Sequence, residues 1–377
     1  MSAPAVSVVM SVFNGERFLA EAIESILGQT FRDFEFLIVN DGSRDGTAEI
    51  LERYRGQDAR IRIVAHENRG LISALNGGIA QALGRYIARM DADDIAVAER
   101  LALQVAYMEQ HPEVALLGGA VEFIDEAGRS LGFRSNPTES AEIRGALLDR
   151  NVIWHPTVFA KRDAVVAAGG YRNVPLAEDY DLWLRMADGS ALGNLETVVL
   201  RYRMHAQQAT VQQNERMSLS ALTSRGAALA RRAGMVDPLD SVVAITPGTL
   251  ARLVGALRPL TGTELRATRT EEQSARLRSY LRWILQVGEV ADERCWSNAI
   301  EALDPRSWQG ARREEMADLQ YTAARLHWGQ GNYLRGASAA SQAVFRQPVI
   351  LGRALKPLLR LVRGETRKFD LWGNETS

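Results

Sequence analysis

The most constraining feature of the sequence is a regular alternation of short apolar runs and amphipathic segments between Val6 and Asp94. The apolar runs are rich in β-branched residues, as strands covered on both faces are, and apolar residues at spacings of three and four follow the first three of them, as in helices. This alternation predicts a parallel sheet with helices on both faces, whose ligands bind beyond the carboxyl ends of the strands. The strands are expected at 6–12, 34–40, 61–68 and 86–94, and the second helix is expected to begin at Asp45 or Thr47 as its N-cap.

The pattern changes twice further along the chain. Between about Val114 and Arg203 the apolar runs indicate a mixed sheet, and from about Gln207 the sequence becomes mainly helical and arginine-rich. We therefore expect two domains. The first, residues 1–210, is an α/β domain with a Rossmann-like, mixed but mainly parallel sheet and flanking helices, and the second, residues 211–377, is mostly α-helical.

Composition excludes several classes of protein. The 377 residues carry 45 lysines and arginines against 46 acidic residues, a balance that argues against a nucleic-acid partner. A single cysteine, Cys295, permits neither an internal disulfide nor a cysteine-based zinc site. No apolar run approaches the ~18 residues of a membrane span, and the apolar start lacks the cationic lead of a signal peptide. The expected location is cytoplasmic.

An acidic run follows the fourth expected strand directly, at Asp91, Asp93 and Asp94. Carboxylates two residues apart at a strand end can reach one hard cation such as Mg²⁺ or Mn²⁺, which keeps positions for substrate phosphates. Such a cation neutralises the charge that grows on a departing diphosphate. The same residues also fit a solvated acidic turn, or the N-terminus of the helix that follows.

Two further strand ends carry polar residues suited to a nucleotide. Asp41 follows the second strand and is placed to accept hydrogen bonds from a nucleoside, although aspartate and glycine also form ordinary tight turns. Arg69 follows the third strand, where its planar guanidinium suits a base or a phosphate; a surface arginine is the alternative.

A second acidic segment begins a later amphipathic helix. Glu178 and Asp179 precede an apolar face that includes Trp183, so they lie at the helix N-terminus, where the helix dipole favours a charged carboxylate able to act as a base. Ordinary placement of acids at a helix start is the alternative. Two histidines are further candidates: His155, which also fits a core or loop position, and His205, a metal or diphosphate ligand or a structural residue.

Together these segments resemble the family 2 glycosyltransferases, which have the GT-A fold. The resemblance runs from Val6 to His205 and rests on three blocks in the family's order: SVVMSVFNGERFLAEAIESILGQTFRDFEFLIVNDGSRDGT, NRGLISALNGGIAQALGRYIARMDADD and HPTVFAKRDAVVAAGGYRNVPLAEDYDLWLRMA. The sequence departs from the family's processive polysaccharide synthases, because it has no Gln-x-x-Arg-Trp and no membrane spans, so one sugar per encounter is expected. Arg69 replaces the residue that many members carry before the glycine.

The resemblance implies roles for individual residues. It places Asp179 as the general base and Asp93 at the metal, which would be Mn²⁺ or Mg²⁺. His205 is a further candidate metal ligand from its position at the end of the last apolar strand. The remaining positions are Val12, Phe13, Asp41, Arg69 and Asp91 at the nucleotide, and His155, Glu178 and Trp183 on the acceptor side.

The resemblance also implies a reaction. An acceptor hydroxyl displaces the nucleotide diphosphate in a single step, which inverts the anomeric configuration. The donor is expected to be a UDP-sugar, and the acceptor a glycan or a lipid-linked molecule in cell-surface polysaccharide or glycolipid assembly. A sugar nucleotidyltransferase and a non-catalytic GT-A-fold scaffold are the alternatives.

The last expected helix carries a basic stripe. Within residues 350–368, arginines and one lysine recur every three or four positions opposite a leucine-rich side. Such a helix suits the anionic inner face of a membrane, which predicts a peripheral attachment, or it docks on the domain with its arginines solvated.

Overall fold

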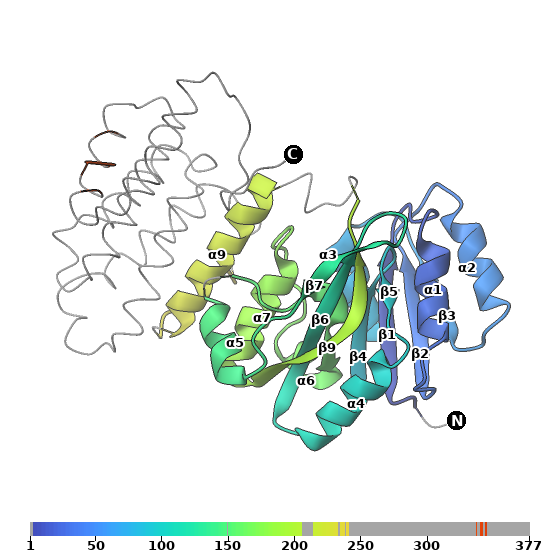
Figure 1. Cartoon of the computed structure of the whole chain (residues 1–377), viewed down its shortest axis with the longest axis horizontal. Helices are drawn as coiled ribbons and strands as arrows, with labels where there is room; N and C mark the ends of the chain where they lie inside the picture. Colours follow the sequence, from blue (N-terminus) through green and yellow to red (C-terminus); the bar gives the residue numbers. More distant parts are fainter. Residues whose placement is uncertain are drawn as a thin grey trace. The chain divides into compact units, whose positions relative to one another are not determined.

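The structure is a computed structural model (Figure 1). It describes residues 3–148, 150–205, 214–232, 234–237 and 239–240, together with the isolated residues 337, 340, 341 and 344. The chain divides into two compact units, Met1–Met217 and Ser218–Ser377. Most of the expected helical domain, including the basic stripe at 350–368, lies outside the described residues. No helix in the described ranges has the length and apolar character to cross a bilayer.

The first half of the large unit has the predicted alternation. Its parallel strands occur in the order β3-β2-β1-β4, and the register pairs Val12 with Asn40 and Ser11 with Asp91. The carboxyl ends of β1, β2 and β4 therefore finish side by side, which brings the residues after them to one edge. The elements are β1 (Val6–Val12), α1 (Leu19–Leu27), β2 (Phe34–Asn40), α2 (Thr47–Arg55), β3 (Ile61–Ala65), α3 (Leu71–Gln81) and β4 (Tyr86–Asp91).

The predicted cap of α2 is wrong in detail. Gly46 occupies the N-cap position and no side chain caps the helix there. Asp45 precedes the N-cap residue by one position. Its carboxylate accepts a hydrogen bond from the backbone N–H of Thr47 at 3.1 Å. Thr47 is itself the first helical residue, so it does not cap the helix.

The second half completes a mixed sheet, as predicted. In the described residues the full strand order is β3-β2-β1-β4-β8-β6-β9-β5, with β7 paired to β6. β8 runs antiparallel between β4 and β6, whereas β6 and β9 are parallel. The remaining elements are β5 (Ile95–Ala96), α4 (Arg100–Gln110), β6 (Val114–Ile124), β7 (Ser130–Arg134), α5 (Ser140–Ala146), the 3₁₀ turn η1 (His155–Thr157), β8 (Phe159–Lys161), α6 (Arg162–Ala167), α7 (Glu178–Gly189), β9 (Ala191–Arg203) and α9 (Asn214–Arg232).

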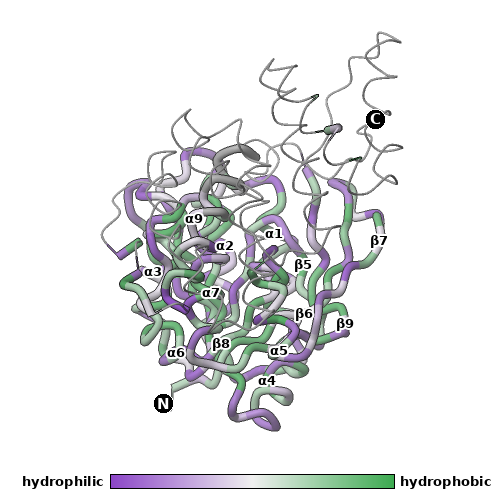
Figure 2. Tube along the Cα trace, turned by 90° about the vertical axis from the view of Figure 1, so that its left-hand side faces the viewer, coloured by the Kyte–Doolittle hydropathy of each residue, from purple (hydrophilic) through white to green (hydrophobic). Residues whose placement is uncertain are grey.

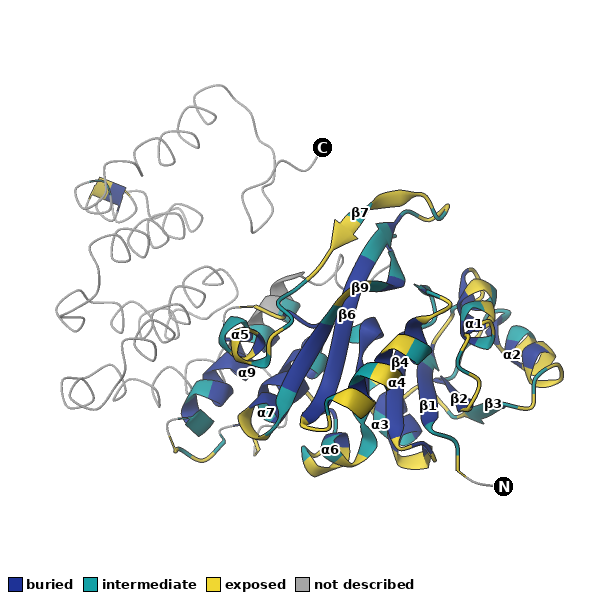
Figure 3. Cartoon of the chain, turned by 60° about the horizontal axis from the view of Figure 1, so that its bottom comes forward, coloured by how far each residue is buried: buried dark blue, intermediate teal, exposed yellow. Residues whose placement is uncertain are grey.

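The core lies between the central strands and the flanking helices. Figure 3 shows β1, β4 and β6 buried, while the outer faces of the helices and most of β7 are exposed. In Figure 2, hydrophobic stretches recur through the region of β6, β8 and β9. The centre of the sheet is therefore largely desolvated, and the acids that follow β2 and β4 lie at the strand ends.

Two adjacent glycines of α3 test how closely this helix packs on the sheet. A Cβ at Gly77 meets nothing within 4 Å, whereas a Cβ at Gly78 lies 2.7 Å from Cγ1 of the buried Val9. Gly77→Ala is expected to raise the free energy of unfolding by about 0.5–1 kcal/mol, because alanine restricts the unfolded chain. Gly78→Ala is expected to lower it by about 1–3 kcal/mol through overpacking. Urea denaturation of both full-length variants measures the difference, and equal effects would contradict the packing of α3 described here.

Candidate functional site

The loop after β3 closes onto the end of β2 through Asp41. This carboxylate is buried, and its two oxygens accept hydrogen bonds from the backbone N–H groups of Arg69 and Gly70 at 2.8 and 2.9 Å. Gly70 has a φ of +85°, a backbone conformation that favours glycine. Asp41 thus fixes the loop that begins α3. This bonding was not anticipated from the sequence, because it joins residues about 28 positions apart.

The other residues expected at the nucleotide differ in their accessibility. The Val12 side chain is buried, and its carbonyl accepts a hydrogen bond from the backbone N–H of Asp41 at 2.9 Å. The next residue, Phe13, is 50% exposed at the same edge. The Arg69 side chain is also exposed. Phe13 and Arg69 are therefore open to a ligand, whereas Val12 offers only backbone atoms.

Three carboxylates crowd together where β4 ends. Oxygens of Asp91, Asp93 and Asp94 all lie within 4.8 Å of one another. Burial raises the pKa of Asp94 well above its usual range, and the charges of Asp93 and Asp91 raise it further. The Asp94 Oδ2 atom is buried without a hydrogen-bond partner. Hard oxygen donors in mutual repulsion, one of them unpartnered, fit a divalent cation such as Mn²⁺ or Mg²⁺.

The end of β9, about 110 positions later in the sequence, is bonded to this cluster. The Arg203 backbone N–H donates to Asp94 Oδ1 at 2.8 Å, and its buried side chain donates to the Asp93 carbonyl at 2.9 Å. Two residues later, His205 Nε2 lies 2.9 Å from Asp93 Oδ2. The structure therefore brings His205, the candidate metal or diphosphate ligand, to the acidic cluster. The part played by Arg203 was missed, although this arginine adjoins the histidine that was singled out.

Arg89, two residues before the cluster on β4, is a buried cation that the sequence analysis did not identify. It forms an ion pair with Asp91, and its Nε atom has no hydrogen-bond partner. Its charge also acts to lower the pKa of Asp179. The charge of Arg89 therefore acts on acids at both the end of β4 and the start of α7.

The start of α7 presents the expected pair of acids. Asp179 Oδ2 accepts a hydrogen bond from Asn151 Nδ2 at 2.9 Å, and Oδ1 contacts the backbone N–H of Tyr180 at 2.6 Å. Burial raises the pKa of Asp179 to about 6. Burial and the Asp179 charge raise the pKa of Glu178 to about 7. The helix dipole was expected to keep these acids charged, but desolvation outweighs it and raises both pKa values. A carboxylate with a pKa near neutrality is suited to general-base work.

The two aromatic residues expected on the acceptor side are packed inward. His155 Nε2 lies 2.8 Å from the Tyr171 hydroxyl, and burial holds the pKa of His155 well below its usual range, so the imidazole is neutral. Trp183 is fully buried and meets the His155 ring edge-on, with centroids 5.9 Å apart. Trp183 therefore supports the site from the core and does not face an acceptor, because the apolar face of α7 packs inward.

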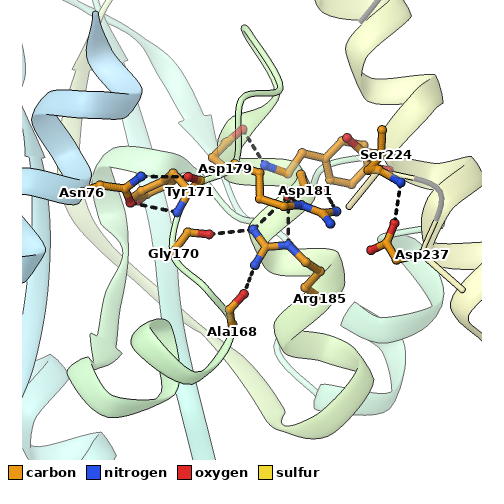
Figure 4. Close-up of polar contacts among 12 residues, drawn as sticks. Asn76, Ala168, Gly170, Tyr171, Asp179, Asp181, Arg185, Ser224 and Asp237 are labelled. Carbon is orange, nitrogen blue, oxygen red and sulfur yellow. Dashed lines mark hydrogen bonds and ion pairs between the residues drawn. The ribbon is translucent and has the colours of Figure 1, made fainter. Parts of the chain in front are cut away.

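A network of charged residues behind Asp179 was also missed. Asp181 is buried and forms ion pairs with Arg172 at 2.6 Å and Arg185 at 2.8 Å. Arg185 also donates to the Gly170 carbonyl at 2.7 Å (Figure 4). The loop before α7 is thus bonded to the helix that carries Asp179.

Comparison with known proteins identifies the family. Residues 7–165 match the family model described as Glycosyl transferase family 2. The chain is 36% identical over 208 residues to the putative glycosyltransferase EpsE of Bacillus subtilis (strain 168), an alignment that covers 54% of this chain and 74% of that protein. The chain is a family 2 glycosyltransferase. This membership decides against the nucleotidyltransferase alternative.

Two other relatives of this family 2 glycosyltransferase carry more specific names. The amylovoran biosynthesis glycosyltransferase AmsE of Erwinia amylovora is 34% identical over 201 residues, covering 52% of this chain and 75% of AmsE. The O-antigen biosynthesis glycosyltransferase WbnJ of Escherichia coli is 34% identical over 204 residues, covering 53% of this chain and 80% of WbnJ.

Solved structures show the fold of the enzyme. The S. aureus TarS fragment 1–349 in complex with UDP-GlcNAc superposes with a TM-score of 0.53 at 15% sequence identity, covering 92% of each chain. The predicted GT-A fold, a mixed sheet with flanking helices, is confirmed.

Proposed function

We propose that this family 2 glycosyltransferase is an inverting, metal-dependent enzyme that moves one sugar from a nucleotide diphosphate sugar to an acceptor hydroxyl. The observation that carries the proposal is the crowding of Asp91, Asp93 and Asp94 at the end of β4. Three carboxylates crowded together at a strand end suit a cation and the diphosphate bound to it. Asp93 and His205 would hold Mn²⁺ or Mg²⁺, which neutralises charge on the leaving diphosphate.

The donor side of the site consists of the strand ends. Asp41 holds the loop of Arg69 and Gly70 in place, and Asp91 is oriented by its ion pair with Arg89. Phe13 is accessible beside them. The TarS structures in complex with UDP and with UDP-GlcNAc support a uridine diphosphate sugar as the donor here.

On the acceptor side, Asp179 is the proposed general base. It accepts the proton of the acceptor hydroxyl while that oxygen bonds to the anomeric carbon. The bond between the anomeric carbon and the diphosphate oxygen breaks, and its electron pair leaves with the nucleotide diphosphate. Attack opposite the leaving group inverts the configuration. Asn151 orients Asp179 through its hydrogen bond. Glu178, which is buried, and His155, which contacts the Tyr171 hydroxyl, support the acceptor side from within.

The acceptor is proposed to be a glycan or a lipid-linked glycan of a cell-surface polysaccharide. The names of AmsE and WbnJ, which refer to amylovoran and O-antigen biosynthesis, support this assignment. Attachment to the inner face of the membrane through residues 350–368 stays a prediction for a segment outside the described ranges. Co-sedimentation with anionic vesicles, compared with a chain truncated before residue 350, would test it.

The pKa of Asp179 predicts how activity depends on pH. Only the ionised carboxylate accepts a proton, and its pKa is raised to about 6, so kcat/KM is expected to fall as the pH is lowered through about 6. Glu178→Gln is expected to leave this acid limb in place, because the raised pKa of Glu178, about 7, keeps its carboxyl mostly neutral in the range where Asp179 titrates. pH profiles of both proteins with one donor measure the limb; a flat profile across this range in the parent protein would contradict the assignment of Asp179.

The proposal is tested first by nucleotide binding. Isothermal titration of the full-length protein with UDP, GDP and dTDP, each with and without Mn²⁺, is expected to show Mn²⁺-dependent binding of UDP. Addition of a chelator is expected to abolish the heat. Binding of none of the three, with or without the cation, would count against a nucleotide-sugar enzyme.

A further inference from the structure

The side-chain amide of Asn76 bridges two parts of the large unit that are far apart in sequence. Asn76 lies in the middle of α3, and its Nδ2 donates to the Tyr171 carbonyl at 2.8 Å. Its Oδ1 accepts from the Tyr171 backbone N–H at 2.9 Å (Figure 4). Asn76 therefore donates to and accepts from the backbone of the same residue. Among side chains, the planar amides of Asn and Gln suit this pairing, because they carry an N–H donor and an oxygen acceptor side by side.

The loop that contains Tyr171 is bonded to α7, the helix that carries the proposed base Asp179. We call residues 168–185 the acceptor block. Within it Arg185 donates to the carbonyls of Ala168 and Gly170, and pairs with Asp181. Asp181 also pairs with Arg172. Because these bonds run from the loop to α7, a displacement of Tyr171 is transmitted to the start of α7, where Asp179 lies.

The other side of the Asn76 bridge is fixed to the nucleotide end of the sheet. α3 begins at the loop whose backbone N–H groups bind Asp41, and it packs closely on β1 at Gly78. Asn76 is therefore a direct polar connection between this anchored helix and the acceptor block.

Local geometry shows that the bridge is closely fitted. Gly170 has a φ of +63°, and a Cβ at this position would lie 2.7 Å from Asn76 Oδ1. Leu176, three residues before Asp179, has a φ of +67°, a conformation that is unfavourable for leucine. Such a conformation persists only where the surrounding structure holds it. The acceptor block is therefore held by contacts from outside it, and the two Asn76 hydrogen bonds to Tyr171 are the contacts that come from α3.

We propose that Asn76 is a positioning residue that sets the place of the acceptor block, and with it Asp179, against the nucleotide half of the sheet. The inference rests on the proposed function, because it assumes that Asp179 acts on the acceptor. Asn76 itself touches no reacting atom. A misplacement of about 1 Å in a reacting group can lower the rate roughly 10²-fold. The loss of one bridging amide that moves Asp179 by this much would therefore lower the rate of transfer measurably.

Two variants and one control test the proposal in the full-length enzyme. Asn76→Ala removes both hydrogen bonds, and Asn76→Asp keeps the shape but places a carboxylate oxygen against the Tyr171 carbonyl. Ser73→Ala changes an exposed residue of the same helix. We expect kcat to fall about 10- to 100-fold in both Asn76 variants, with the donor KM and Mn²⁺-dependent UDP binding unchanged. Ser73→Ala is expected to behave as the parent protein does.

The histidines provide a readout that needs no acceptor. His155 reports on the acceptor block through Tyr171, and His66 lies 3.3 Å from Asp41 at the nucleotide end. In ¹⁵N-histidine NMR spectra we expect the His155 imidazole signal to move in both Asn76 variants while the His66 signal stays in place. An unmoved His155 signal, or an unchanged kcat, would overturn the proposal, as would a parallel loss of UDP binding. If the parent protein binds no nucleotide, the proposed function fails, and the His155 signal still decides the role of Asn76.

Discussion

Asp179→Asn is expected to lower the rate of sugar transfer by about 10²- to 10⁴-fold, the usual contribution of a general base. The amide has nearly the shape of the carboxylate but cannot take the proton of an acceptor hydroxyl. Asp179 contacts Asn151 and Tyr180 and lies outside the acidic cluster of β4, so Mn²⁺-dependent binding of UDP is expected to remain. Transfer is measured as release of nucleoside diphosphate in the presence of acceptor, and binding by titration calorimetry.

Glu178→Gln is the matched control for this variant. It removes the neighbouring carboxylate on the same helix turn, which is buried and has a raised pKa of about 7. It is expected to retain most of the activity at neutral pH. If Glu178→Gln loses transfer and Asp179→Asn keeps it, the base is Glu178. If Asp179→Asn loses UDP binding as well, Asp179 has a structural role.

Asp93→Asn is expected to remove the dependence on the cation and to lower transfer by about 10³-fold, which corresponds to roughly 4 kcal/mol of lost stabilisation of the leaving group. Asp93 lies within 4.8 Å of both Asp91 and Asp94 in the cluster, and its Oδ2 atom lies 2.9 Å from His205 Nε2. Removing one of three crowded charges relieves repulsion, so the metal-free variant is expected to melt at a higher temperature than the parent protein. The stabilisation that Mn²⁺ gives the parent protein is expected to disappear.

Thermal unfolding with and without Mn²⁺ measures both effects. Asp163→Asn is the matched control, because it is the same substitution at a carboxylate whose side chain is 94% exposed on α6. This control is expected to keep the Mn²⁺ effect and the activity. If Mn²⁺ raises the melting temperature of Asp93→Asn as much as that of the parent protein, the cation binds elsewhere.

The fold of the nucleotide half was predictable because its signals are local. β1, β2 and β4 are apolar runs covered on both faces, and the helices between them repeat their apolar residues at helical spacing. The elements that were missed lack such a signal. β5 has two residues, and β7 exposes Leu131 and Phe133, so neither shows the periodicity of a buried element.

The site was predictable only where its residues lie in a motif. Asp91, Asp93 and His205 stand at strand ends, and the structure brings them together. The residues that hold the site were not predictable, because their bonds span the fold: Arg203 reaches Asp93 across 110 positions and Asn76 reaches Tyr171 across 95. Sequence periodicity carries no information on such contacts.

Trp183 shows a different limit. Its spacing correctly predicted the apolar face of α7, but the resemblance assigned it to the acceptor side. The structure places it fully inside the core, against His155. The position of Trp183 near the proposed base is thus explained by its packing in the core, as is common for large aromatic residues, and not by substrate binding.

The most direct test of the account is donor turnover by the full-length protein. A panel of UDP-, GDP- and dTDP-sugars is incubated with Mn²⁺ and with cell-surface glycan acceptors, and released nucleoside diphosphate is measured with and without chelator. A metal-dependent, inverting transferase is expected to release nucleoside diphosphate from one UDP-sugar, and both the chelator and Asp93→Asn are expected to abolish this release. Release that is insensitive to the chelator and to Asp93→Asn would contradict the proposed metal site and the mechanism built on it.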